Sequence, residues 1–178
     1  MEKDERKLVI EDLKAAILKA IASEWGMQGH NMSGKAMSSM EARTIEDNAN
    51  SLTIDFLAPG YVGILNAGVT ADKIPFSPGS GAKHSLYIDG LMRFAMKRMG
   101  LDEKAALGVA FAIAHTQKRE GMPTRGSFAF SSTGKRTGFV EVAIDKEMPL
   151  IQDYINKLFD NVLQTTIEII MKENKQWR

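Results

Sequence analysis

The stretch "LTIDFLAPGYVGILNAG", Leu52 to Gly68, contains the strongest strand pattern in the chain. Leu52, Ile54 and Phe56 alternate with polar residues, as in a strand with one buried face. The turn-forming residues Ala58 to Gly60 follow, and then a second apolar run. The pattern predicts an antiparallel hairpin over 51–66.

A segment rich in Gly, Pro and Ser follows this hairpin, at 68–84. Compact domains rarely contain a loop of this length unless it is functional. Ile74 and Phe76 could anchor it to an apolar surface, and Lys83 supplies a charge. We expect a docking segment that lacks order until a partner binds.

Before the hairpin, apolar residues at helical spacing predict an amphipathic helix over 4–25. Residues 26–40 are rich in Gly, Ser and Met and predict a second long loop. Residues 41–47 predict another strand, and "DNANS" predicts a turn.

After the 68–84 loop, helices are expected at 85–99 and 103–119, with Ser85 and Asp102 as their N-caps and Gly100 between them. Leu91, Phe94, Ala95 and Arg98 would share one side of the first of these helices.

A third loop is expected at 120–138. Alternation in "FVEVAI" then predicts a strand, and a wide apolar stripe predicts a long helix over 147–175. The expected fold is α+β in one domain of 1–178. A small antiparallel sheet of three to four strands would pack against an N-terminal helix, two central helices and a long C-terminal helix.

The composition limits the possible functions. The chain has 178 residues, no cysteine and a formal net charge of +1. Thiolate chemistry and disulfides are therefore excluded, and no strong overall charge attracts nucleic acid or membrane. The charged start "MEKDERK" does not resemble a secretory signal, and no run is long enough to predict a transmembrane helix.

Catalytic motifs are weak. "GHNMSGKA", Gly29 to Ala36, nearly matches a phosphate-binding loop, but Ala36 lacks the hydroxyl that would hold Mg²⁺. His30, His84 and His115 show no metal-binding spacing, and no Gly-x-Ser-x-Gly elbow is present. We expect no enzyme activity, no cofactor and no metal, with a small uncharacterised enzyme as an alternative.

The 120–138 loop combines basic and aromatic side chains between 125 and 136. Three interpretations remain open: a solvated loop anchored by its phenylalanines, contact with a protein groove, or contact with a nucleic-acid strand.

The order of these elements resembles the neck and tail-completion proteins of tailed bacteriophages. The resemblance covers roughly residues 5–170. Its motif is a turn, a tyrosine, a few apolar residues, a polar residue and a glycine, here Pro59, Tyr61, Asn66 and Gly68. The family often has an acidic residue where this chain has Asn66. The runs "KIPFSPGSGAKHSLYIDGL" and "AFAIAHTQKREGMPTRGSF" resemble neck proteins of Bacteroidetes-infecting phages, the crAss-like group among them.

The resemblance implies a structural virion protein, made in the host bacterial cytoplasm. Copies would form a head–tail connector ring around the DNA channel, in contact with portal, adaptor or tail proteins and with no membrane. The residues expected at interfaces are Ile74, Phe76, Lys83, Arg125, Phe128, Phe130, Lys135, Arg136, Tyr154 and Leu158. A nucleic-acid-binding protein that uses loop 125–136 is the other alternative.

Overall fold

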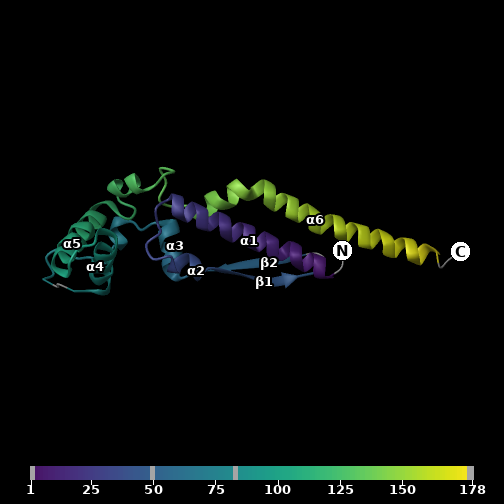
Figure 1. Ribbon diagram of the computed structural model, residues 1–178, viewed down its shortest axis with the longest axis horizontal. Coiled ribbons are helices and arrows are strands. Elements are labelled where there is room, and N and C mark those ends of the chain that lie inside the picture. Colours follow the sequence, from purple (N-terminus) through teal and green to yellow (C-terminus); the bar gives the residue numbers. More distant parts are fainter. Residues whose placement is uncertain (1–2, 49–50, 82–83, 176–178) are drawn as a thin grey trace. The chain divides into compact units, whose positions relative to one another are not determined.

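The structure is a computed structural model that describes residues 3–48, 51–81 and 84–175 (Figure 1). Lys83 lies outside the described residues, and so do the side chains of Val162, Ile169 and Ile170 in the expected C-terminal stripe. The α+β class is confirmed. Along the chain, helices both precede and follow the two strands.

The chain divides into two compact units. Unit 1 comprises 1–24, 40–57 and 140–178, and unit 2 comprises 25–39 and 58–139. Two of the boundaries fall inside helices α1 (Lys3–Met27) and α6 (Phe139–Lys175). The sequence shows no linker between the units because the chain passes between them partly along continuous helix.

Unit 1 combines parts of α1 and α6 with an antiparallel hairpin of β1 (Glu41–Asp47) and β2 (Leu52–Leu57). The expected strands at 41–47 and 52–57 are confirmed. These two strands pair with each other, so the observed hairpin begins earlier in the chain than the hairpin predicted over 51–66. The sheet of the described residues has two strands, and the expectation of three to four is wrong.

Among the residues of unit 1 whose side chains are described, the buried apolar ones are Ile10, Leu13 and Ile21 of α1 and Ala143 and Leu158 of α6. Two ion pairs join elements of this unit: Arg6 Nε lies 2.7 Å from an Asp47 oxygen, and Lys146 Nζ lies 2.6 Å from an oxygen of the buried Glu24.

The prediction of a second strand in the 51–66 hairpin is wrong. Residues Gly60–Ala67 form helix α3 after Pro59. Val62 is buried and Leu65 is half-buried, a spacing of three that places both on one face of a helix. The apolar run is too short for its period to be read from sequence.

The strand predicted at "FVEVAI" is also wrong, because these residues are the first turns of α6. Phe139 and Ala143 are both buried and lie one helical turn apart. Helix α6 continues through Pro149, although proline removes one backbone donor from a helix interior.

Unit 2 is built around α4 (Leu86–Met99) and α5 (Glu103–Glu120), which form a helical hairpin (Figure 1). The predicted caps are confirmed. Ser85 and Asp102 accept hydrogen bonds from the backbone N–H groups of Ile88 and Ala105, and Gly100 ends α4 in the left-handed conformation. The small buried residues Ala106, Ala110 and Ala114 of α5 allow close packing.

The 68–84 segment contains a 3₁₀ turn, Ala71–Lys73, and is anchored within unit 2. Ile74 is 4% exposed. Phe76 packs on the core cluster that includes Ile88, with its ring centroid 4.9 Å from that of His115. Lys118 Nζ donates to the carbonyls of Asp72 and Ile74, at 3.3 and 3.1 Å.

A second contact joins the segments that precede α4 and follow α5. Val69 and Met122 form an isolated antiparallel bridge, so these two segments lie side by side. The helical hairpin is therefore an insertion with adjacent ends.

Unit 2 also contains an aromatic cluster. Trp25 packs edge-on to Phe139, with ring centroids 5.1 Å apart, and lies 4.9 Å from the ring of His30. The predicted 26–40 loop adds one short helix, α2 (Lys35–Ser38). Among the described residues, no helix is long and apolar enough to cross a membrane.

Candidate functional site

The basic-aromatic segment 125–136 follows α5 and begins as a 3₁₀ helix, Arg125–Phe130. Backbone and side-chain groups tie its end to the first loop of unit 2. Ser132 N donates to the Met27 carbonyl at 2.8 Å, and Arg136 Nη1 donates to the Gln28 carbonyl at 2.5 Å. The segment has a defined course within unit 2.

The basic side chains of this segment differ in their surroundings. Arg136 is half-buried and turned toward the 26–31 loop. Lys135 is exposed, and Arg125 lies in a different pocket. A nucleic-acid strand would use several of these charges along one path, and Arg136 is already engaged with a backbone carbonyl.

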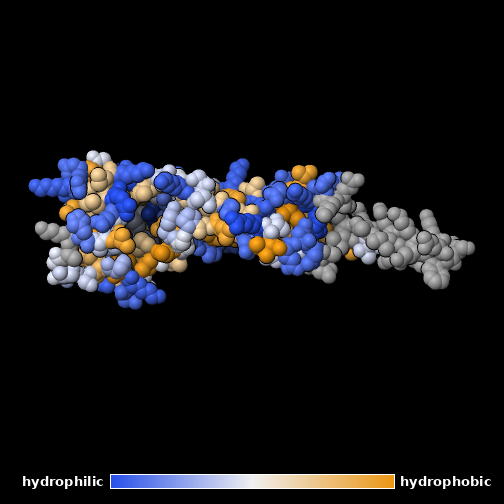
Figure 2. All heavy atoms as spheres, turned by 90° about the horizontal axis from the view of Figure 1, so that it is seen from below, coloured by the Kyte–Doolittle hydropathy of each residue, from blue (hydrophilic) through white to orange (hydrophobic). Residues whose placement is uncertain are grey.

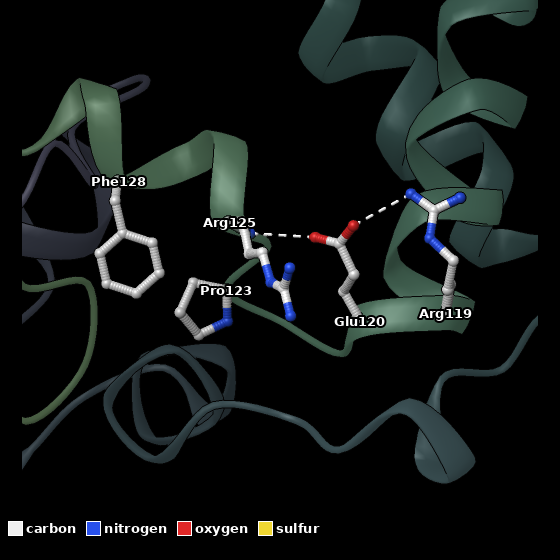
Figure 3. Close-up of a pocket in the computed structure, with 5 residues that line it drawn as sticks. All are labelled: Arg119, Glu120, Pro123, Arg125 and Phe128. Carbon is white, nitrogen blue, oxygen red and sulfur yellow. Dashed lines mark hydrogen bonds and ion pairs between the residues drawn. The ribbon is translucent and has the colours of Figure 1, made fainter.

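Arg125 lines a shallow pocket of about 420 Å³ with Arg119, Glu120, Pro123 and Phe128 (Figure 3). The Glu120 carboxylate accepts from the Arg119 guanidinium at 3.0 Å and from the Arg125 backbone N–H at 3.1 Å. In Figure 3 the Arg125 side chain lies between Pro123 and Glu120, and Phe128 lies on the other side of Pro123.

The Arg119 hydrogen bond, then the Arg125 N–H, lower the pKa of Glu120. Glu120 is therefore a carboxylate at neutral pH and partly neutralises the two arginines beside it. A carboxylate at this position opposes the binding of a phosphate, while it is compatible with a polar protein partner.

Unit 1 exposes large apolar side chains on α6. Phe159, Leu163 and Ile167 follow one another at intervals of four residues and are 59, 59 and 52% exposed. Residues at this spacing lie on one helix face. We call these three residues the α6 stripe.

The β1–β2 hairpin exposes further apolar groups: Ile45 is 62% exposed, and Phe56 and Leu57 are 37 and 38% exposed. Ile45 sits at a register shift between Thr44 and Glu46, where the strand carries an extra residue. On the face shown in Figure 2, apolar surface in orange is interspersed with polar surface in blue.

The residues expected at interfaces divide into two groups. Ile74 and Leu158 are buried within units 2 and 1, and Phe76 is half-buried against a core cluster, so these three side chains pack mainly within their own units. The residues next to them in the sequence do not reveal this burial, because it depends on contacts with residues that are distant in the chain.

The remaining interface candidates are accessible to different degrees. Phe128 and Phe130 are 41 and 69% exposed, and Arg125 and Lys135 are exposed. Tyr154 is half-buried, with Lys157 Nζ 5.3 Å from its ring centroid. The sequence predicted an apolar stripe on the 147–175 helix, but the three exposed residues Phe159, Leu163 and Ile167 were not among the interface candidates, and neither was Ile45.

The "GHNMSGKA" stretch does not have the strand–loop–helix context of a phosphate-binding loop. It follows helix α1, and Lys35 begins the four-residue helix α2. In the part of the chain that the structure describes, no three His, Asp or Glu side chains are placed to hold a metal ion together.

No family model, no curated protein and no solved structure matches the chain.

Proposed function

We propose that the protein is a structural subunit of an oligomeric ring in the neck of a tailed bacteriophage, between the portal and the tail. The observation that carries this proposal is the exposed apolar surface of unit 1, above all the α6 stripe. The resemblance of the sequence to phage neck proteins is the reason for proposing a neck ring rather than another assembly.

The apolar exposure in unit 1 favours an assembly role over a free monomer. Single exposed apolar residues are common, but a contiguous apolar row on a helix is typical of an interaction surface. Burying one such side chain stabilises a complex by about 1.5–3 kcal/mol. The row Phe159, Leu163 and Ile167 therefore offers a substantial part of an interface.

The hairpin provides a second contact. Among the described residues, β1 and β2 pair only with each other, so each has an outer edge that no described strand covers. A two-stranded sheet is marginally stable alone, and an added strand or helix stabilises it. In a ring, one surface of each copy meets a different surface of the next. The hairpin and the α6 stripe are two such surfaces.

The pocket at Arg125 supports protein contact rather than DNA binding. Its two arginines lie beside the Glu120 carboxylate, and Phe128 adds an apolar wall. A subunit that surrounds passing DNA should bind it weakly, and the net charge of +1 is consistent with that requirement.

The test is to localise the chain in virions of a phage that encodes it, by mass spectrometry and by imaging of antibody-labelled particles. We expect several copies at the neck. A chain absent from particles, or present as one copy, would contradict the proposal.

A variant tests the surface itself. Leu163→Asp places a charge within the α6 stripe and should prevent incorporation into particles, while the stability of the isolated chain changes by no more than about 0.5 kcal/mol. Gln152→Asp, at an exposed position of the same helix, is the matched control and should be incorporated normally. Equal incorporation of both variants would exclude the stripe as an interface.

A further inference from the structure

Unit 2 contains a second, larger cavity of about 510 Å³ that the proposed ring contacts do not use. Its volume lies within the range of roughly 300–1,000 Å³ that is typical of small-molecule sites. It is bounded by α4, α5, the end of α3 and the segments around 29–30 and 122–136.

Most of its wall is apolar. Leu91 and Phe94 come from α4, Ile113 from α5 and Leu65 from α3. Leu91 and Phe94 belong to the helix side that the sequence predicts, and Arg98 continues the same side. An apolar chain that enters this cavity gains the full benefit of removal from water.

Two arginines line the same cavity. Arg98 Nη1 donates to the Asn31 carbonyl at 3.0 Å, and Arg136 Nη1 donates to the Gln28 carbonyl at 2.5 Å. Each guanidinium has five N–H donors, so each retains donors beyond these bonds. Arg136 Nε is buried and has no hydrogen-bond partner among the described residues.

The two positive charges are not neutralised locally. None of the described residues that line the cavity is acidic, and no ion pair among the described residues includes Arg98 or Arg136. Burial, then the charge of Arg98, lowers the pKa of Arg136, which is the direction expected for like charges close together. An anion in the cavity would relieve this repulsion.

His30 adds a third polar group to the wall. Its ring packs against both Trp25 and Phe139, with centroids 4.9 and 5.5 Å away, and its Nε2 is buried without a hydrogen-bond partner among the described residues. Burial, then the Arg136 charge, lowers the pKa of His30 to about 4, so the ring is neutral at pH 7. A neutral imidazole has one N–H donor and one acceptor nitrogen, so His30 adds no charge to the cavity wall.

We propose that this cavity binds a small amphipathic carboxylate, with the apolar chain against Leu91, Phe94 and Ile113 and the carboxylate between Arg98 and Arg136. Planar guanidinium groups match a carboxylate in two-bond geometry, and hydrogen bonds between charged groups are stronger than those between neutral groups. A cation is disfavoured by both arginines, and a neutral apolar molecule leaves their charges unpaired. Such binding does not depend on whether the chain forms a ring.

The probe is sodium decanoate at monomeric concentrations, added to the full chain labelled with ¹³C at the methionine methyl groups. Met99 and Met122 line the cavity and serve as reporters, and Met32 and Met148 are exposed elsewhere. We expect saturable shifts at the two reporters and none at the two distant methyl groups. Decan-1-ol should bind at least about tenfold more weakly, because it lacks the charged hydrogen bonds.

Variants separate charge from packing. Arg98→Gln should weaken decanoate binding about tenfold and leave decan-1-ol binding unchanged. Arg93→Gln, on the same helix but outside the cavity wall, is the matched control and should bind decanoate normally. Arg98 is the first choice because it is exposed, whereas Arg136 is half-buried and bonded to the 26–31 loop.

Three outcomes would overturn the proposal. One is the absence of saturable decanoate shifts at Met99 and Met122, and another is equal affinity for decanoate and decan-1-ol. The third is tighter binding of the peptide acetyl-Leu-Phe-Asp-amide at the same methyl groups, which would assign the cavity to a protein segment.

Discussion

Val69 and Met122 exchange two backbone hydrogen bonds of 2.7 Å each, which join the two ends of the α4–α5 insertion. Each residue of the bridge has a glycine beside it, Gly68 and Gly121. Both glycines adopt extended backbone angles with positive φ, at φ 77°, ψ 178° and φ 84°, ψ −168°. This region is essentially restricted to glycine. The bridge therefore depends on two residues that contribute no side chain.

Gly121→Ala should destabilise unit 2. An added Cβ would lie 2.6 Å from the Val69 carbonyl oxygen, and the backbone angles are strained for alanine. We expect a loss of at least about 2 kcal/mol in the free energy of unfolding, measured with urea by Trp25 fluorescence in a Trp177→Phe background. Gly100→Ala is the matched control: φ is +65°, no atom lies within 4 Å of the added Cβ, and the expected loss is about 1 kcal/mol. Equal losses would show that the contact with Val69 has no effect.

Phe76→Ala should lower the stability of the isolated chain. Phe76 packs on the α4–α5 cluster and contacts the rings of Phe111 and His115, so its truncation should cost about 2–3 kcal/mol. Phe128→Ala, which removes a 41% exposed ring, should cost less than about 1 kcal/mol. Urea midpoints of the two variants provide the comparison. A stable Phe76→Ala chain would return Phe76 to the interface candidates.

Stability should fall between pH 6.5 and 4 because of His30. Burial, then the Arg136 charge, lowers the pKa of its imidazole from 6.5 to about 4 in the folded chain. Between these values the unfolded chain binds a proton that the folded chain does not, so acid favours unfolding. Above pH 6.5 and below pH 4 this histidine adds no further pH dependence.

Two measurements check this prediction. Proton NMR of the His30 ring follows its titration directly, and urea midpoints at pH 7.5 and 5 measure the loss of stability. His30→Gln should reduce the difference between the two midpoints, and His84→Gln, at an exposed position, should not. A His30 ring that titrates near 6.5 would refute the prediction.

Lys146→Met should destabilise unit 1, because it removes the ammonium group that lies 2.6 Å from the Glu24 carboxylate. Glu24 is 1% exposed, and breaking an ion pair to a buried carboxylate costs about 3 kcal/mol. Lys146→Arg retains the charge and should recover most of the loss. A double-mutant cycle with Glu24→Gln measures the pair itself, and a coupling free energy under about 0.5 kcal/mol would contradict its role.

The sequence predicted the elements whose ends depend on adjacent residues. Ser85, Gly100 and Asp102 cap α4 and α5 through bonds to atoms a few residues away, so local composition fixes these ends. The alternation of Leu52, Ile54 and Phe56 likewise predicted β2. In both cases the interaction and the sequence signal lie within one short window.

Only the tertiary structure decided the conformation of the short apolar runs. "YVGILNA" and "FVEVAI" are too short for their period to be decisive, and both are helical. In the second run, Phe139 and Ala143 are buried one helical turn apart. The burial of Ile74 and Phe76 also depends on α5, which follows them in the chain.

The candidate sites divide in the same way. The sequence determined that Arg125, Phe128 and Arg136 occur close together in one segment, but the fold places Arg125 beside Glu120 and Arg136 beside Gln28. The sequence also determined which side of α4 carries Arg98, but it did not determine which residues lie opposite Arg98. Local capping and period are set by covalent neighbours, whereas a cavity depends on contacts between residues distant in the chain, which no short window of sequence contains.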